Sequence, residues 1–412
     1  MKIRRRDFLK SGGVVVAFSW NAPTVLAQAA ARPDLPGSLG ANRMLDGWVR
    51  INPAGTVTVF TGKCEFGQGI LTALAQIAAE ELDVAYGRVE MVSADTARTP
   101  NEGMTAGSLS VENSGTALRF ACAEARQMLL ELAAAKLGVA VARLTVTDAT
   151  VTSPGKKLTY WELARDVNFK REASARARPK PPAQHAIVGR SIPRRDIPAK
   201  MTGGAAFVQD LRLPGMLHGR VVRPPRYGAR LESFDEATVK AMPGVVAVVR
   251  DGSFLGVVAR REEQAINARL VLIGSARWSG GPALPDPEKL YEQLMSLRSE
   301  ARVIGEKDAP VPAGAKAIEA TYHRPYLAHA SIAPSCAVAE LKEGKLTVWT
   351  HSQGVFPLRA TIARALGLAP SDVRCIHAEG AGCYGHNGAD DVAFDAAMLA
   401  RAVDGQPVWR QG

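Results

Sequence analysis

Apolar and polar residues alternate on both sides of the turn Pro53-Ala54-Gly55, which predicts a β-hairpin between Trp48 and Thr61. Apolar residues then recur at helical spacing and predict a helix over about residues 70–82. The stripe that they form is Leu71, Leu74, Ala75, Ala78 and Leu82. One face of this helix is therefore expected to be buried. The next strand is predicted near Val89–Ser93.

A long loop of small residues runs from Asp95 to Asn113, and a second amphipathic helix is predicted from about Ser114 to Leu137. Gly138 supplies the left-handed residue that commonly ends a helix. Cys122 lies on the apolar face of this helix, so we interpret it as a core residue.

The second half of the chain shows a similar mixture of strands, helices and turns. A helix is predicted over Leu358–Leu366, and a glycine-rich loop from Glu379 to Asp391 precedes the start of another helix. The predicted strands are Met216–Val222, Val245–Val249, Leu346–Trp349 and Val373–His377. No internal repeat is visible.

The composition is that of a folded globular protein. The 412 residues are 47% hydrophobic and 22% charged, which excludes disorder and fibrous repeats for the whole chain. The 38 glycines and 25 prolines indicate a loop-rich α/β or α+β protein. The sequence contains no run of 18 apolar residues, so no ordinary membrane span is predicted. The five cysteines form no C-x-x-C pair, so neither a disulfide framework nor a zinc ribbon is indicated.

Much of the net charge of +11 lies in two blocks. The block at residues 170–200 holds nine Lys or Arg, interleaved with prolines at 179, 181 and 182. A nucleic-acid interface is one interpretation of such a block. No aromatic residue or known binding motif accompanies it, so we predict a solvated basic linker at residues 165–187 and no nucleic-acid partner.

The other basic block is at the N-terminus. Arg5-Arg6-Asp7-Phe8-Leu9-Lys10 fits the twin-arginine export pattern, and a short apolar stretch and small residues up to Ala27 follow it. We predict a signal peptide at residues 1–27, with cleavage after Ala27, or after Ala29 or Ala31, and a periplasmic location. Because this route exports proteins that are already folded, it also hints at a bulky prosthetic group.

Three loops place glycine and small polar residues where a strand ends and a helix begins. They are Gly67-Gln68-Gly69, Thr105 to Ser110, and Gly380 to Gly388. Glycine lets the backbone approach a ligand, and a helix N-terminus offers unpaired N–H groups at the positive end of its dipole. The amide of Gln68 and the hydroxyls of the second loop suit a phosphate or pyrophosphate. Together, the three loops indicate a large phosphorylated cofactor.

Longer motifs carry a family resemblance. Thr61 to Thr72 matches G-x-x-E-x-G-Q-G-x-x-T, and Thr105 to Ser110 with Gly115 matches T-A-x-S-x-S. Further matches are Asp196 to Gly203, Leu213 to Gly219, Arg223-Pro224-Pro225, His329-Ala330-Ser331, Pro334, Gln353 and Gly382 to Asp391. With these motifs, residues 44 to 408 resemble the molybdopterin-binding subunits of the xanthine dehydrogenase (molybdenum hydroxylase) family. The order of the motifs is similar to that of the branch that includes isoquinoline 1-oxidoreductase beta and nicotinate dehydrogenase large subunits.

The resemblance implies an α+β fold in which molybdopterin-binding lobes flank an α/β hammerhead domain. The expected division is a first lobe at residues 28–164, the basic linker at 165–187, the hammerhead domain at 188–290, and the start of a second lobe at 310–412. That second lobe is expected to be incomplete. Relatives continue beyond the Pro407-Val408 pair into a strand with W-x-R, whereas Trp409-Arg410 here is followed by the end of the sequence.

The resemblance also implies a cofactor and its ligands. The cofactor would be molybdenum held by molybdopterin, in its cytosine dinucleotide form. Gln68, with Gly67 and Gly69, would bind the pterin or phosphate part. Ser108 and Ser110, with the backbone amides of Ala106 and Gly107, would bind the pyrophosphate. Gln353 would lie beside a molybdenum oxo ligand, with Tyr384 and Gly385 near the metal centre. No side chain of the protein would ligate the metal.

The family reaction hydroxylates an electrophilic carbon of an aldehyde or an N-heterocycle with oxygen from water, and a glutamate acts as the base. Electrons leave through [2Fe-2S] clusters on a small partner subunit, and a cytochrome c is a further acceptor to consider. The base lies in a G-x-G-E motif that has no match here. Gly305-Glu306 has the wrong context, and we interpret Glu306 as a surface acid. We therefore expect no catalytic base in this chain and, for an active enzyme, a second chain that supplies the remainder.

Two alternatives remain. The chain is an inactive remnant of such a subunit if no complementary chain exists. A periplasmic zinc-binding protein would use Cys375, His377, Cys383 and His386, but their spacing matches no standard zinc pattern. We interpret the histidines at 351, 377 and 386 as structural or loop residues.

Overall fold

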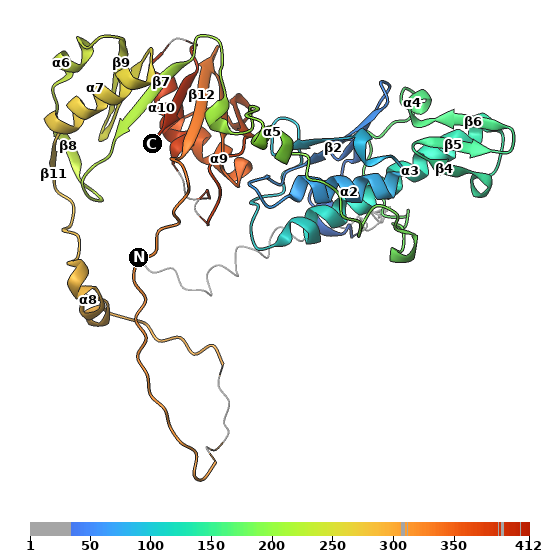
Figure 1. Ribbon diagram of the computed structural model, residues 1–412, viewed down its shortest axis with the longest axis horizontal. Helices are drawn as coiled ribbons and strands as arrows, with labels where there is room; N and C mark the ends of the chain where they lie inside the picture. Colours follow the sequence, from blue (N-terminus) through green and yellow to red (C-terminus); the bar gives the residue numbers. More distant parts are fainter. Residues whose placement is uncertain (1–33, 306–309, 311, 386, 389–390, 404) are drawn as a thin grey trace, which may run out of the picture. The chain divides into compact units, whose positions relative to one another are not determined.

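A hairpin and a crossover helix begin the fold, as predicted, in the computed structural model of this chain (Figure 1). β1 (Val49–Asn52) pairs antiparallel with β2 (Thr56–Thr61), with Val49 opposite Val59. β3 (Val89–Ser93) then pairs parallel to β2. A parallel pair needs a long connection, and α2 (Ile70–Leu82) supplies it with the predicted bounds.

The structure describes residues 34–305, 310, 312–385, 387–388, 391–403 and 405–412. The predicted signal peptide, His386 and Glu306 lie outside the described residues. No helix in the part of the chain that the structure describes is long and apolar enough to cross a membrane.

The second helix begins close to the predicted Ser114 and follows a helical turn that was not predicted. A wide turn with π-helical hydrogen bonds covers Ser110–Gly115, and α3 continues over Thr116–Leu137. A Cβ on Gly115 would lie 3.0 Å from Ile77 of α2, so the wide turn brings the two helices close together. Gly138 ends α3 at a φ of 67°, and Cys122 is fully buried, both as predicted.

A small antiparallel sheet and a short helix extend this first lobe beyond α3. The helix begins with a capping box, in which the side chains of Thr159 and Glu162 each accept from the other's backbone amide. These elements are β4 (Thr145–Thr147), β5 (Thr150–Ser153), β6 (Lys156–Thr159) and α4 (Tyr160–Leu163).

The basic segment 165–187 is held against the first lobe, which corrects the prediction of a solvated linker. The carboxylate of Glu80, buried on α2, accepts from the backbone amides of Ala186–Val188 at 2.6–3.0 Å. Lys180 pairs with both Glu80 and Asp83. Buried carboxylates need donors and cations, and this segment supplies them. The same backbone N–H groups lower the pKa of Glu80, although burial on its own would raise it.

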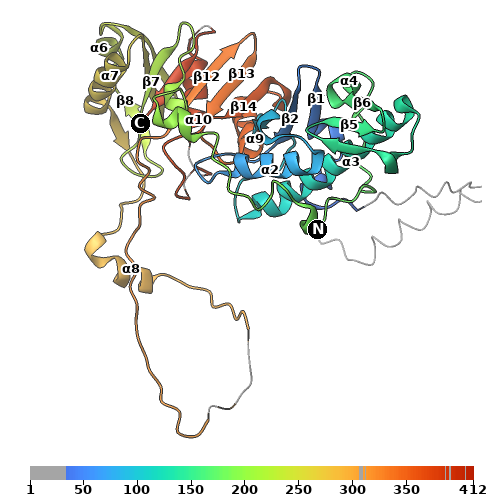
Figure 2. The same ribbon diagram turned by 45° about the vertical axis from the view of Figure 1, so that its right-hand side comes forward.

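The rest of the chain builds one mixed seven-stranded sheet, whose right-hand strands in Figure 2 are β12, β13 and β14. Its strand order is β14-β13-β12-β15-β7-β10-β9. The strands are β7 (Leu217–Val222), β9 (Val245–Asp251), β10 (Phe254–Ala259), β12 (Cys336–Lys342), β13 (Lys345–Thr350), β14 (Val373–His377) and β15 (Val408–Gln411).

This sheet crosses the predicted boundary between a hammerhead domain at 188–290 and a lobe at 310–412. β15 lies between the two segments, antiparallel to β12 and parallel to β7. Without β15, β7 and β12 would each have an edge with unpaired backbone N–H and C=O groups. β15 forms hydrogen bonds with both of these edges. Trp409 and Arg410, which looked interrupted in the sequence, are buried in this inner strand. The predicted α+β class agrees with the mixture of helix and sheet.

Helices cover both faces of this sheet. α9 (Val355–Leu366) and α10 (Val392–Ala400) share one apolar cluster with Val221, whereas α7 (Glu262–Ser275) shares another with Val222. Adjacent strand residues point to opposite faces, so the helices lie on opposite sides. α9 begins at Val355 rather than at the predicted Leu358, because a proline is tolerated in the first turn. The other elements are α5 (Ile197–Met201), α6 (Glu236–Lys240), α8 (Leu290–Ser296), β8 (Arg230–Ser233) and β11 (Arg277–Ser279).

The first lobe meets the seven-stranded sheet beside β14. The backbone amide of Thr96 donates to Cys375 at 3.0 Å, and Asp95 forms a bridge with Ile376. The Arg374 guanidinium pairs with the buried Asp95 carboxylate at 2.5 Å. These contacts place the segment that follows β3 beside β14.

Candidate functional site

The first loop is shaped by a buried glutamate. The Glu65 carboxylate accepts from the backbone amides of Gly67, Gly69 and Leu71 at 3.0, 2.8 and 3.1 Å. The N–H groups of Gly69 and Leu71 belong to the start of α2, where a negative charge also suits the helix dipole. Gly67 and Gly69 have φ values of 110° and 78°, which favour glycine. Glu65 is the glutamate of the motif G-x-x-E-x-G-Q-G. An acid just before a predicted helix was therefore the sequence feature that indicated this role.

The amide of Gln68 closes the same loop. Its Nε2 donates to the carbonyl of Cys64 at 2.8 Å, and its Oε1 accepts from the amide of Phe66 at 2.8 Å. A primary amide has two N–H donors, so one N–H of Gln68 is left for a ligand. The side chain thus both orders the loop and presents a donor at its surface.

The second loop turns back on itself before α3. Gly107 and Ser108 are both left-handed, with φ values of 66° and 59°. A serine in this region is strained by roughly 1 kcal/mol, and such strain is concentrated at functional sites. The helical turn that starts at Ser110 directs its first N–H groups towards this loop. Hydroxyls and helix N–H groups are the donors that bind a phosphate.

The third group of residues joins the lobes. Gln353, which follows β13, donates from Nε2 to the carbonyl of Thr105 at 3.0 Å, and its own carbonyl accepts from the Thr105 amide at 2.8 Å. The Cys383 thiol donates to Gln353 Oε1 at 3.2 Å. The hydroxyl of Thr105 accepts from the Cys64 amide at 2.9 Å, so all three loops are linked.

One polar cavity of about 420 Å³ lies between these loops. Seven of the ten predicted cofactor-binding residues line it: Gln68, Ala106, Gly107, Ser108, Ser110, Gln353 and Gly385. Phe66, Thr105 and Cys383 complete the lining and were not predicted as site residues. Gly67 and Tyr384 line a neighbouring cavity of about 470 Å³ instead, and Gly69 is the N-cap of α2. The structure thus brings the predicted residues together, and their role as cofactor ligands stays a prediction.

The charges near the polar cavity lie behind its wall. Lys63 is buried and donates to the backbone carbonyls of Glu102 and Met104 at 2.9 and 3.3 Å, which fixes the approach to the second loop. The Glu102 carboxylate in turn accepts from the hydroxyls of Thr61 and Ser114 at 2.8 and 3.0 Å. No lysine, arginine, aspartate or glutamate is among the described lining residues. An anion in this cavity would therefore be bound by N–H and O–H dipoles and not by a formal positive charge.

Three carboxylates near the first loop, Glu65, Asp196 and Glu379, have ligand atoms within 4.8 Å of one another. Two cations already pair with this group. Lys200 pairs with Asp196 at 2.5 Å and with Glu379 at 2.6 Å, and the bidentate guanidinium of Arg194 holds the pKa of Asp196 well below its usual range. Burial raises the pKa of Glu379. Arg194 also donates to the Gly67 carbonyl at 2.6 Å, so this network anchors the first loop.

The zinc alternative finds no support in the described residues. No cluster of potential metal ligands there includes Cys375, His377 or Cys383, and His386 lies outside the part described. Burial raises the pKa of the Cys375 thiol to about 12. Zinc is bound by thiolates, so this cysteine is a poor ligand at neutral pH.

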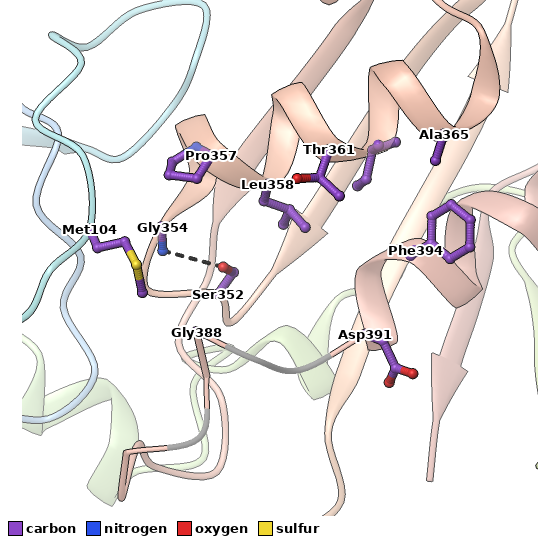
Figure 3. Close-up of a pocket in the computed structure, with 11 residues that line it drawn as sticks. Met104, Ser352, Gly354, Pro357, Leu358, Thr361, Ala365, Gly388, Asp391 and Phe394 are labelled. Atoms are coloured by element: carbon purple, nitrogen blue, oxygen red, sulfur yellow. Dashed lines mark hydrogen bonds between the residues drawn. The ribbon is translucent and has the colours of Figure 1, made fainter. Parts of the chain in front are cut away.

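A second cavity, also of about 420 Å³, borders the same loops (Figure 3). Ser352 and Gly354 line it, on either side of Gln353, and Met104 lines it next to Thr105. Its other walls are Pro357, Leu358, Thr361, Ile362, Ala365, Gly388, Asp391 and Phe394. We call this space the apolar cavity. A Cβ on Gly388 would lie 2.6 Å from Met104 Cε, so Met104 occupies room that the glycine leaves.

Comparison with known proteins identifies the class. The molybdopterin cofactor-binding domain matches this chain twice, at residues 13–188 and at residues 291–410, which together cover most of the sequence. The first match contains the loops around Gln68 and Ser108, and the second contains Gln353 and Gly385. The chain therefore belongs to the xanthine dehydrogenase/xanthine oxidase family of molybdopterin-dependent oxidoreductases, as the sequence motifs predicted.

Two of three similar relatives support the predicted branch. The chain is 41% identical to a nicotinate dehydrogenase subunit of Pseudomonas putida, over 86% of this chain and 31% of that protein. It is 25% identical to the isoquinoline 1-oxidoreductase beta subunit of Brevundimonas diminuta, over 98% of this chain and 58% of that protein. It is 28% identical to the membrane-bound aldehyde dehydrogenase [pyrroloquinoline-quinone] of Gluconacetobacter polyoxogenes, over 98% of this chain and 55% of that protein. The chain thus spans between 31% and 58% of the length of these relatives.

Proposed function

We propose that this chain forms the cofactor-binding part of a molybdenum hydroxylase that oxidises an aldehyde or an N-heteroaromatic compound with oxygen from water. The convergence of three loops on one polar cavity carries the proposal. Gln68, Ser108 and Gln353 come from segments far apart in the sequence, and they meet around a space without charged walls. Two of the relatives are named for N-heteroaromatic substrates and one for aldehydes.

The residues of the polar cavity fit a phosphorylated pterin. The left-handed turn at Gly107 and Ser108 and the start of the helix at Ser110 would hold the pyrophosphate of a cytosine dinucleotide through N–H and O–H donors. Gln68 and Gln353 would orient the pterin and metal end with their amides. When bound, the group supplies the two-electron redox chemistry and activates the oxygen that is transferred. We assign no catalytic base among the described residues.

The apolar cavity is the proposed place of the substrate. Its walls are aliphatic and aromatic, and Asp391 is the one ionisable side chain among the described lining residues. Asp391 already pairs with Arg223 at 2.8 Å, and the mainly hydrocarbon lining suits a neutral ring or aldehyde better than a substrate that carries a carboxylate. Gln353 lies between Ser352 and Gly354, so substrate and cofactor would meet at this loop.

The partners and the location follow from the same proposal. A subunit with [2Fe-2S] clusters would take the electrons, and a cytochrome c is a further acceptor. We propose a periplasmic location, with export of the folded protein by the twin-arginine route, because the N-terminal motif and a cofactor that is inserted before export agree with each other.

Cofactor content of the full chain, purified from a host that makes molybdopterin, tests the proposal. We expect bound molybdenum, pterin fluorescence after oxidation, and cytidine monophosphate after acid hydrolysis. Gln68→Ala and Ser108→Ala should each lower the pterin content several-fold, because each removes a donor from the cavity. The matched controls Gln293→Ala and Ser296→Ala, on the exposed face of α8, should leave it unchanged. Equal pterin in all four variants would contradict the assignment.

A further inference from the structure

His377, the last residue of β14, has its ring between two backbone carbonyl groups from different loops. Nδ1 lies 3.0 Å from the carbonyl oxygen of Ser352, and Nε2 lies 2.6 Å from that of Glu65. A carbonyl oxygen accepts hydrogen bonds and cannot donate them. Each ring nitrogen must therefore carry a proton if both contacts are hydrogen bonds. A neutral imidazole has one such proton, and the imidazolium cation has two.

We propose that His377 is a positively charged clamp at neutral pH that fixes the first cofactor loop to the loop that carries Gln353. The imidazolium donates one hydrogen bond to each loop. In this role His377 is a positioning residue, because it acts through Glu65 and Ser352 and does not line the polar cavity.

The contacts around the ring agree with a cation. The thiol of Cys64 is its titratable neighbour and lies 3.5 Å from the same Ser352 carbonyl. The nearby carboxylates are committed elsewhere: Glu65 to the amides of α2 and to Arg194, and Asp95 to Arg374. The buried ammonium of Lys63 faces the carbonyls of Glu102 and Met104. No carboxylate is therefore needed to explain the charge, since two carbonyl dipoles face the ring.

The expected titration follows from the same contacts. Burial would lower the pKa of His377, but its interaction with Cys64 and the hydrogen bonds to Glu65 and Ser352 raise that pKa to about 9. A histidine whose pKa is raised on folding stabilises the fold fully below its unfolded pKa of about 6.5. That stabilisation is lost as the pH rises through about 9. The clamp is therefore closed at neutral pH and opens in alkali.

The position of the clamp connects it to the cofactor. Glu65 is followed by Phe66, and Ser352 by Gln353, and both of these next residues line the polar cavity. When the ring loses one proton, one of the two carbonyls faces a nitrogen lone pair and is repelled. The loops should then separate and release the ligand between them. This last step rests on the proposed function, whereas the charge of His377 does not.

Nuclear magnetic resonance of the full chain labelled with ¹⁵N-histidine tests the charge directly. The chain has 7 histidines, and the signal that is lost in His377→Gln identifies the ring. We expect both nitrogens to be protonated at pH 7 and to titrate near pH 9. A single protonated nitrogen at pH 7, or a midpoint at or below 6.5, would overturn the proposal. This measurement needs no cofactor.

Pterin retention by the loaded protein between pH 6 and pH 10 tests the positioning role. Wild type and the control His323→Gln, whose ring is exposed and stacked on Tyr291, should lose pterin as the pH passes about 9. His377→Gln should hold at least threefold less pterin at pH 7 and should show no step near pH 9. A step that persists in His377→Gln would contradict this role. If no sample ever binds pterin, the proposed function fails, while the resonance titration still decides the charge.

Discussion

The polar and the apolar cavity have the same volume, about 420 Å³, and opposite chemistry. Both are built from the loops around residues 104–110, 352–354 and 380–391. The polar cavity takes amides and hydroxyls from these loops, and the apolar cavity takes mainly hydrocarbon side chains. In the proposed function, these two spaces that share their loops would take different ligands, a phosphorylated cofactor and an uncharged substrate.

Neighbours in the chain account for the difference. Thr105 lines the polar cavity, whereas its neighbour Met104 lines the apolar cavity. In the same way, Gln353 lines the polar cavity, and Ser352 and Gly354 on either side of it line the apolar cavity. In an extended backbone, successive side chains point in opposite directions. The assignment of each cavity therefore depends on the register of two short loops, which the hydrogen bonds between Thr105 and Gln353 hold. Three substitutions test whether the cavities are independent.

The largest effect is expected for Glu65→Gln, which should remove the support of the first loop. The amide keeps one acceptor and loses the charge that faces three N–H groups, so the free energy of unfolding should fall by about 2 kcal/mol. Denaturant unfolding measures this loss, and pterin content should fall with it. Glu131→Gln, at an exposed position on α3, is the control. Unchanged stability of Glu65→Gln would show that the carboxylate does not hold the loop.

Gln353→Leu is expected to have an intermediate effect, mainly on the polar cavity, because the backbone hydrogen bond from the Thr105 amide to the Gln353 carbonyl remains. The leucine fills a similar volume but loses the hydrogen bonds to Thr105 and Cys383. Cofactor affinity should fall roughly tenfold, which corresponds to about 1.4 kcal/mol. Equilibrium dialysis of the released pterin measures it. An affinity equal to that of the wild type would show that the side chain of Gln353 does not contribute to cofactor binding.

Met104→Ala should have the smallest effect and should act on the apolar cavity alone. Removal of this side chain enlarges the space beside Gly354 and Gly388. In the complete enzyme, KM for small neutral substrates should rise about threefold, while KM for bulkier ring systems should change less or fall. Pterin content should stay at the wild-type level. A loss of pterin instead would mean that the two cavities are one site.

Local pattern predicted most of the elements near the site. The bounds of α2, β3 and β14 agree with the sequence prediction, and Gly138 ends α3 as expected, because each depends on side chains within a few residues. The π-helical turn before α3 was not predicted, and it lies where Gly115 comes close to Ile77 of α2, a contact between residues distant in the chain. The motifs also indicated seven residues that meet in the polar cavity.

The remaining features depend on residues distant in the chain. The basic segment was expected to be solvated, but the buried Glu80 on α2 binds it through backbone amides that carry no sequence signature. Cys383 and Phe66 line the polar cavity because the loops pack against one another, and the sequence did not indicate them as lining residues. His377 gave no signal as a clamp, because its charge follows from two carbonyl oxygens that the fold places on either side of it.

The order of residues along the chain was enough to assign the family, the local helices and strands, and the glycines that let three loops turn sharply. Folding in three dimensions was needed to show that β15 completes one continuous sheet, that Gly67 and Tyr384 face a different cavity from Gln68, and which carbonyls meet His377. The reason is physical. Backbone conformation depends on neighbours along the chain, whereas a cavity and a buried charge depend on atoms that come together only after the chain has folded.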